Sequence, residues 1–332
     1  MQDDQGDGAP KASIWTRLSW ALGAAAVAVV VVVAARSSET RELLRLLREI
    51  RPGWVAAAAV LQAATYACDA SIWRRVLARA AAPQPFGRMC RLSIARLFVG
   101  QALPSGGLSG DLLVVRALSR YGVASDVSTT ALLLNLFGFY AAFAGCALLA
   151  AIVFYASGTL SGPILGIAIP FSVLVVGIPG LIAWLVRSER SARRTFWRRV
   201  PLLGRMLETL GRARPELLRD RRLLGLAVGL QTATFALDAG TLLVMLMALG
   251  VRASIAPDAF AAFVLASAAE LVGPVPGGLG AFEGGCIVGL HAFGVPVETA
   301  LLATLLLRGF TFWLPMVPGF FVARWAVAGK RR

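Results

Sequence analysis

The stretch Leu61-Gln-Ala-Ala-Thr-Tyr-Ala-Cys-Asp-Ala70 returns later in the chain as Leu230-Gln-Thr-Ala-Thr-Phe-Ala-Leu-Asp-Ala239, with seven identical positions in ten. Both copies carry an aspartate, Asp69 and Asp238, in an apolar neighbourhood. Internal repeats in membrane proteins often form the two halves of a transport mechanism. The recurrence therefore predicts an internal duplication that bears on mechanism.

A second pair of segments supports the duplication. Pro104-Ser-Gly-Gly-Leu-Ser-Gly-Asp111 and Pro276-Gly-Gly-Leu-Gly-Ala-Phe-Glu283 each carry an acid seven residues after a proline. Chance similarity between apolar, glycine-rich segments is the alternative explanation. The agreement of several spacings favours a duplication, and it indicates residues 53–157 and 225–329 as the two copies.

The composition is that of an integral membrane protein. The chain has 332 residues, of which 58% are hydrophobic, and its mean hydropathy is +0.72. About 20 consecutive apolar residues are enough for a helix to cross the hydrocarbon of a bilayer. We therefore predict an all-α polytopic protein with about six full spans. These spans are expected at 14–35, 53–73, 126–156, 163–186, 223–249 and 299–327.

The net charge of +15 comes mainly from arginines between the apolar runs. Basic residues are retained on the cytoplasmic side of membrane proteins. Six spans then place both termini, residues 74–91 and residues 187–222 in the cytoplasm, and the protein in the cytoplasmic membrane of a prokaryote. An anionic-lipid contact surface at 187–222 is a compatible alternative, whereas nucleic acid is not predicted. The segment 36–52 falls outside in this topology and suits an interfacial amphipathic helix.

Two further apolar regions, 92–122 and 256–295, are each broken near the centre by proline and glycine. Neither half is expected to span alone, so each region predicts a re-entrant helical hairpin, with tips at Pro104–Gly107 and Gly273–Gly280. Irregular backbone at membrane depth is tolerated where protein or water surrounds it. An odd number of elements between the copies makes the second copy inverted, as in many secondary transporters. The expected units are 1–52 (first span and amphipathic helix), 53–157 (repeat 1), 158–224 (linking span and basic loop) and 225–329 (repeat 2).

Charged residues inside predicted spans are the first candidates for function, because a charge in hydrocarbon is costly without a partner. Asp238 lies near the centre of its span and Asp69 lies toward the end of its own. A protonated, hydrogen-bonded acid is the structural alternative for both. Arg308 lies inside the last span and requires an acidic partner, which Glu270, Glu283 or Asp238 could supply. A permanent pair would be a structural lock, and a pair that opens to admit a lipid headgroup would be a gate.

The hairpin tips are the second group of candidates. Glycine lets the backbone turn and approach a ligand closely, and free amides at helix N-termini favour anions. A phosphate-bearing headgroup would suit such a site, although Pro-Gly breaks also serve as simple hinges. The substrate-binding candidates here are Pro104, Gly106, Gly107 and Asp111 in the first hairpin, and Pro276, Gly277, Gly278, Gly280 and Glu283 in the second.

Metal and cofactor chemistry is not expected. The one histidine, His291, has no second histidine or paired cysteine nearby in sequence, and no CxxC spacing is present. The sequence also contains no Walker motif and no dinucleotide fingerprint. The four cysteines, which we expect to be free, are Cys68, Cys90, Cys146 and Cys286.

Two blocks carry a family resemblance: Leu103–Asp111 with Arg116 and Gly122, and Pro274–Glu283 with Gly294, Val295 and Arg308. In these blocks the chain resembles the lysylphosphatidylglycerol synthase transmembrane-region family, the flippase-like membrane half of the multiple peptide resistance factor. The resemblance implies an integral membrane protein that moves or handles lipids in prokaryotic membranes. The aminoacyl-transferase domain of the full synthase has no counterpart in this sequence, so lysine transfer is not expected.

The second block is the more specific of the two. In the first block, Val114 stands where the family pattern has an arginine, and the following span has Asn135 and Leu136 where the family has an acid-arginine pair. We therefore expect the site in the second hairpin rather than equally in both.

These features predict a lipid-translocating or lipid-binding carrier and not an enzyme. Asp69, Asp238, Glu283 and Arg308 are expected to line one polar furrow for an anionic or phosphate-bearing headgroup. Two alternatives stay open. One is a non-transporting accessory subunit of a lipid-synthesis system, and the other is an intramembrane enzyme that uses Asp111, Glu270 or Glu283 on a lipid-linked substrate. A homodimer and a lipid-synthesis partner are both compatible with the sequence.

Overall fold

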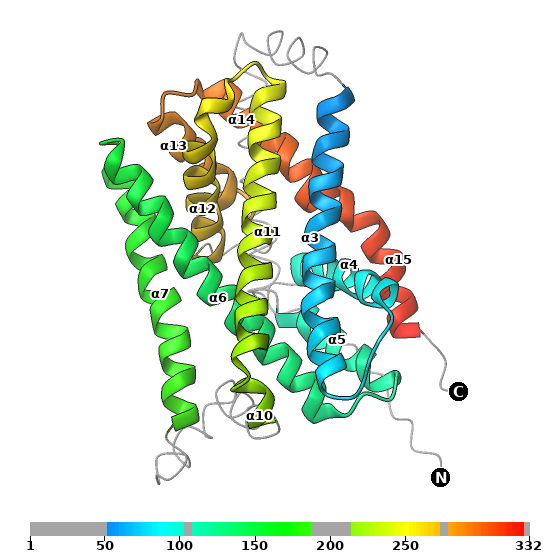
Figure 1. Ribbon diagram of the computed structural model, residues 1–332. Helices are drawn as coiled ribbons and strands as arrows, with labels where there is room; N and C mark the ends of the chain where they lie inside the picture. The colour runs from blue at the N-terminus through cyan, green and yellow to red at the C-terminus, as the bar shows by residue number, and fades with distance from the viewer. Residues whose placement is uncertain (1–51, 103–107, 188–213, 273–277, 329–332) are drawn as a thin grey trace, which may run out of the picture.

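The computed structural model describes residues 52–102, 108–187, 214–272 and 278–328, and every regular element in these ranges is helical (Figure 1). This confirms the all-α prediction for the described part of the chain. The helices are α3 (Pro52–Arg79), α4 (Phe86–Ala102), α5 (Leu108–Arg120), α6 (Ser125–Ala156), α7 (Gly162–Arg187), α10 (Pro215–Leu218), α11 (Arg221–Ala248), η1 (Ala253–Ile255), α12 (Ala256–Val272), α13 (Ala281–Ala292), α14 (Val297–Arg308), the π-helical turn η3 (Gly309–Trp313) and α15 (Leu314–Ala328).

Several of these helices are long and apolar enough to cross a membrane. Among the described residues five segments meet this condition, and the chain is therefore a multi-pass membrane protein. The segments are Pro52–Arg79, Ser125–Ala156, Arg221–Ala248, Ala253–Val272 and Val297–Val322. Four of them coincide with predicted spans.

The sequence interpretation needs one correction in the second hairpin region. Its first half was expected to be too short to span, but η1 continues into α12 and the run from Ala253 to Val272 has 20 residues. By length and composition alone this segment can cross a membrane. The predicted span 163–186 lies within α7, whereas 14–35 and 36–51 lie outside the described residues.

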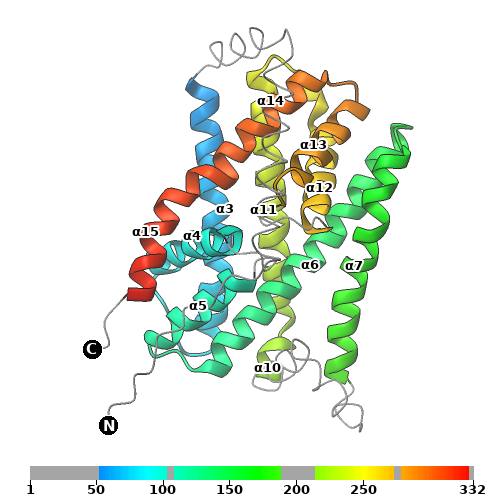
Figure 2. The same cartoon turned by 180° about the vertical axis from the view of Figure 1, so that it is seen from behind.

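Two long helices form the centre of the structure and two short helix pairs flank them. The central helices α3 and α11 pack side by side, and the pairs α4–α5 and α12–α13 lie toward opposite ends of the molecule in both views (Figures 1 and 2). The long helix α6 packs against α12, and α15, the end of the continuous helical run Val297–Ala328, packs against α4. Each short pair is therefore covered by a long helix or helical run from the other half of the chain.

One capping interaction fixes the start of α11. The Asp220 carboxylate accepts hydrogen bonds from the backbone N–H groups of Arg222 and Leu223, and Arg79 of α3 donates to its other oxygen at 3.2 Å. The Arg222 backbone N–H, followed by the Arg79 guanidinium, lowers the pKa of Asp220. Such a cap satisfies backbone donors that a helix start leaves open, and here it also ties α11 to the end of α3.

Small residues allow the helices of the second hairpin to approach closely. A Cβ atom added at Gly285 would lie 2.9 Å from Ala269 Cβ, and one at Gly289 would lie 2.9 Å from Ala262 Cα. Helices in membranes associate largely through such close backbone packing, since lipid is as apolar as the side chains. The stripe of small residues therefore holds α13 against α12.

We predict that Gly285→Ala lowers the stability of the protein by about 1–3 kcal/mol, because the added methyl group overpacks the α12–α13 contact. Gly284→Ala is the matched control, since no atom lies within 4 Å of its added Cβ and alanine favours a helix more than glycine. Thermal unfolding midpoints of the purified variants in detergent measure both effects. Equal midpoints would show that the contact does not constrain the hairpin.

Candidate functional site

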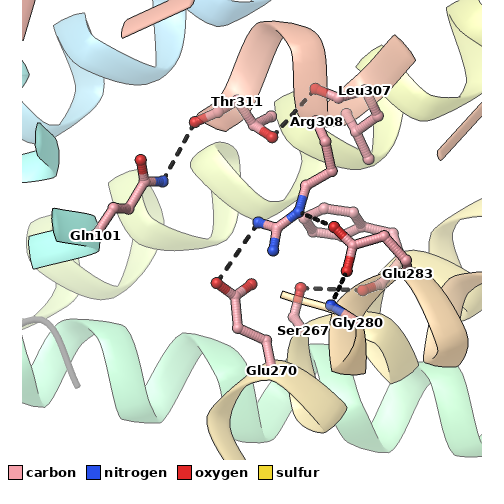
Figure 3. Close-up of polar contacts among 9 residues, drawn as sticks. Gln101, Ser267, Glu270, Gly280, Glu283, Leu307, Arg308 and Thr311 are labelled. Atoms are coloured by element: carbon pink, nitrogen blue, oxygen red, sulfur yellow. Dashed lines mark hydrogen bonds and ion pairs between the residues drawn. The ribbon is translucent and has the colours of Figure 1, made fainter. Parts of the chain in front are cut away.

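Arg308, the last residue of α14, is the centre of a buried ion cluster (Figure 3). Its Nε atom donates to Glu283 Oε1 at 2.8 Å, and its Nη1 atom lies 3.6 Å from Glu270 Oε1. The Arg308 side chain is 5% exposed. Three helices, α12, α13 and α14, thus converge on one guanidinium, as the sequence predicted when it required an acidic partner for Arg308.

The two carboxylates of this cluster are held differently. Glu283 is 8% exposed, and its second oxygen accepts the backbone N–H of Gly280 at 2.6 Å, which closes the first turn of α13. Glu270 is 34% exposed and makes the longer contact. Glu283 is therefore a structural lock that joins the hairpin to α14, whereas Glu270 is the more accessible partner of the arginine.

Glycine at the second tip lets the backbone lie directly on Glu270. Gly278 has φ +61°, and a Cβ atom added there would lie 2.3 Å from Glu270 Cγ. Gly280 has φ +83° and provides the amide that Glu283 accepts. Side chains are disfavoured in this backbone region. Both glycines therefore have a physical reason to be glycine, and both act on the carboxylates around Arg308.

Aromatic rings and a π-helical turn complete the surroundings of Arg308. The guanidinium carbon lies 4.5 Å from the centroid of the Phe282 ring and 5.0 Å from that of Phe312, distances at which a ring face stabilises a cation. Directly after Arg308 the helix widens into the π turn η3. Single π turns inside α-helices are frequent at functional sites. The cation is thus stabilised by two ring faces as well as by carboxylates.

A second ion cluster joins α3 to the first short helix pair around Arg96, whose side chain is 26% exposed. Arg96 of α4 donates through Nη2 to Asp69 Oδ1 at 2.8 Å and through Nη1 to Asp111 Oδ1 at 2.9 Å. Asp69 is 8% exposed and Asp111 is 3% exposed. The sequence interpretation selected both aspartates but missed Arg96. The available signal was an arginine inside the apolar half 92–102 of a predicted hairpin.

Asp238 belongs to neither cluster. Gln62 of α3 donates to Asp238 Oδ1 at 2.8 Å and to Thr241 Oγ1 at 3.1 Å, across the α3–α11 contact. Asp238 was also considered as a partner of Arg308; the ion pairs described for that guanidinium, at 3.6 Å and 2.8 Å, are with Glu270 and Glu283. The four residues predicted to line one furrow thus make their contacts in three polar groups, around Arg308, around Arg96 and around Asp238.

One hydrogen bond connects the first helix pair to the surroundings of Arg308. Gln101, near the end of α4, donates to the backbone carbonyl of Thr311 in η3 at 3.3 Å (Figure 3). Thr311 follows Arg308 by three residues. This contact therefore joins the helix that carries Arg96 to the turn that follows Arg308.

Some expectations fall on residues that the structure does not describe. The tip residues Pro104, Gly106, Gly107, Pro276 and Gly277 lie outside the described ranges. The four cysteines are free, and no group of three or more possible metal ligands occurs among the described residues.

Comparison with known sequences decides the family. A sequence model described as the lysylphosphatidylglycerol synthase TM region matches residues 20–319. The chain belongs to this family. It is also 42% identical over 55 residues to a phosphatidylglycerol lysyltransferase of Staphylococcus haemolyticus, a match that covers 17% of this chain and 6% of that enzyme. The family resemblance expected from the hairpin motifs is thus confirmed.

The two carboxylates around Arg308 in this family member are expected to differ in their effect on stability. We predict that Glu283→Ala lowers stability by about 3–5 kcal/mol, because it breaks a buried ion pair and also removes the acceptor for Gly280. Glu270→Ala should cost about 1 kcal/mol or less, since a partly exposed, longer pair contributes little. Thermal unfolding of both variants in detergent measures this difference. The same loss in both would contradict the distinction between lock and accessible partner.

Proposed function

We propose that this protein is a lipid carrier of a prokaryotic cytoplasmic membrane that binds a phosphate-bearing headgroup at Arg308. The observation that carries the proposal is the unequal pairing of this buried arginine, which holds Glu283 at 2.8 Å and the more exposed Glu270 at 3.6 Å. A guanidinium binds phosphate through parallel hydrogen bonds in a planar fork. Arg308 can therefore exchange one anionic partner for another.

In this mechanism Glu270 is the gate and Glu283 is the lock. A headgroup phosphate takes the place of Glu270 at Nη1, while Glu283 keeps Arg308 attached to α13. Exchange is favourable compared with simple opening, because a buried charge without a counter-charge is costly. Return of Glu270 to the arginine then releases the headgroup. The acyl chains stay in lipid throughout.

The proposed architecture is an inverted repeat with two re-entrant hairpins. The short pairs α4–α5 and α12–α13 lie toward opposite ends of the molecule, and each is covered by a long helix from the other half, which supports this arrangement (Figures 1 and 2). Residues 53–157 and 225–329 are the two proposed copies. Rocking of one copy against the other would expose Arg308 to the two membrane surfaces in turn. Both termini would be cytoplasmic, and the protein would not be an enzyme.

Transport of fluorescent lipids in reconstituted vesicles tests this function. Vesicles of phosphatidylcholine carry a trace of tail-labelled phosphatidylglycerol or phosphatidylcholine, and a membrane-impermeant quencher reports which leaflet holds the label. We expect the wild type to move the label selectively by headgroup. Arg308→Lys keeps the charge but removes the planar fork, and it should lower the rate about tenfold, which corresponds to ~1.4 kcal/mol.

Glu270→Gln should have a different effect from Arg308→Lys. Without a competing carboxylate the headgroup leaves Arg308 slowly, so the maximal rate falls while less lipid is needed for half-saturation. Glu216→Gln, at an exposed acid in the first turn of α10, is the matched control and should behave as the wild type. Unchanged kinetics in both site variants would remove Arg308 from the mechanism.

The alternatives predict other outcomes of the same experiment. Folded wild-type protein that moves no lipid but purifies with a lipid-synthesis enzyme would favour the accessory-subunit function. A chemically altered lipid after incubation would favour an intramembrane enzyme. Each result is distinct from headgroup-selective movement.

A further inference from the structure

We propose that Asp69, Arg96 and Asp111 form a proton-binding site that couples proton movement to the lipid transport proposed above. The inference rests on that proposed function, but the site itself can be tested without transport. It lies on α3, α4 and α5, whereas Arg308 is the last residue of α14.

The first reason is charge. One guanidinium serves two carboxylates, at 2.8 Å from Asp69 and 2.9 Å from Asp111, so the three ionised groups carry one excess negative charge. The Arg308 cluster has the same charges, but there Glu270 is 34% exposed, whereas both aspartates here are buried. Burying a charge without full compensation costs several kcal/mol in a low-dielectric surrounding. Two carboxylates that share one site do not readily both ionise. Uptake of one proton by this pair removes the excess charge.

The second reason is a set of polar atoms without partners. Within the described residues, Asp69 Oδ2, Arg96 Nε, Ser93 Oγ and Trp73 Nε1 are buried and make no hydrogen bond. Ser93 lies one helical turn from Arg96, and Trp73 lies one turn from Asp69, on the two helices that pack together here. Buried polar groups are normally satisfied. These unsatisfied atoms indicate a ligand that binds here reversibly, and Asp69 Oδ2 is the acceptor available to that ligand.

A proton fits this site better than a metal cation. Hard metal cations such as Ca²⁺ and Mg²⁺ need several oxygen ligands. The positive charge of the guanidinium that contacts both carboxylates also repels such ions. A proton needs one oxygen and no coordination shell. The charge and the geometry therefore point to the same ligand.

Among the described residues, the titratable groups that interact electrostatically with Asp69 or Asp111, apart from Arg96, supply no positive charge. Cys68 of α3, Cys90 of α4 and Tyr140 of α6 are within electrostatic reach of the aspartates, and these side chains are neutral at physiological pH. On α11, Asp238 is held by Gln62. The described residues of α15 that follow Trp313, up to Val322, include no charged side chain.

The coupling route follows α4. A proton taken up by the Asp69–Asp111 pair weakens the contacts with Arg96, which lies five residues before Gln101 on the same helix. Gln101 holds the carbonyl of Thr311 in the turn that follows Arg308. In addition, Gly319 of α15 packs against α4 so closely that an added Cβ would lie 2.5 Å from Phe98 Cβ. Movement of α4 is therefore transmitted directly to the helix that carries the headgroup site.

The transport arm of the test uses the full chain in the phosphatidylcholine vesicles described above. We expect an imposed pH gradient to change the initial rate of labelled-lipid movement severalfold in the wild type. Asp69→Asn should move lipid at the same rate with and without the gradient. Asp126→Asn is the matched control, since Asp126 also pairs with an arginine, Arg214 at 2.6 Å, but outside the cluster, and it should keep the response. A wild-type response to a sodium gradient at clamped pH, or none to pH, overturns the proposal.

An infrared titration of the purified protein tests the site without transport. The wild type should show the absorption of a protonated carboxyl group near neutral pH, and this component should be lost in Asp69→Asn or Asp111→Asn. Both variants leave Arg96 with one carboxylate, so folding is expected and is checked by gel filtration. An unchanged band in both variants overturns the proposal. If the band is lost in the variants but the wild type moves no lipid, the transport function is refuted and the proton site is supported.

Discussion

The requirement that a buried arginine keep a counter-charge organises this structure. Two arginines, Arg96 and Arg308, are each held within the apolar part of the chain by two carboxylates. Removal of such a charge from water is repaid only by close ion pairs and further hydrogen bonds. The short helices are therefore not free to separate from the long ones, because separation would leave a charge unpaired in lipid.

The sequence was sufficient to predict the class of fold, most spans and the environment of Arg308. A charge inside an apolar run demands a partner, and the glycine-rich tip supplied Glu283 at a recognisable spacing. The sequence was not sufficient for Arg96. Arg96 lies between the two matched blocks, which are displaced by 169 and 172 residues, so its counterpart is Leu265 or Ala268 and the repeat gave no signal. Basic residues near it were also taken as topology determinants.

The hydrogen-bond partner of Asp238 could not be predicted from the sequence for a different reason. In the predicted duplication Gln62 and Gln231 are counterparts, as are Asp69 and Asp238. Gln62 donates to Asp238, yet Gln231 donates to Asn135 of α6 and Asp69 accepts from Arg96. A pattern of matched residues predicts that they lie in equivalent places. It does not predict which of several competing donors each carboxylate accepts, because that depends on packing between distant helices.

This difference between matched halves fits a carrier that alternates between two orientations. A fully symmetric pair of copies would present the same opening to both membrane surfaces, so access could not alternate. Here the arginine of the first cluster comes from the first arm of a short pair, whereas that of the second comes from the long helix after it. Arg96 of α4 therefore joins the other arm of its own pair, α5, to the long helix α3, whereas Arg308 joins the helix after the second pair to both arms of that pair. Such a division suits one site that binds a proton and another that holds a headgroup.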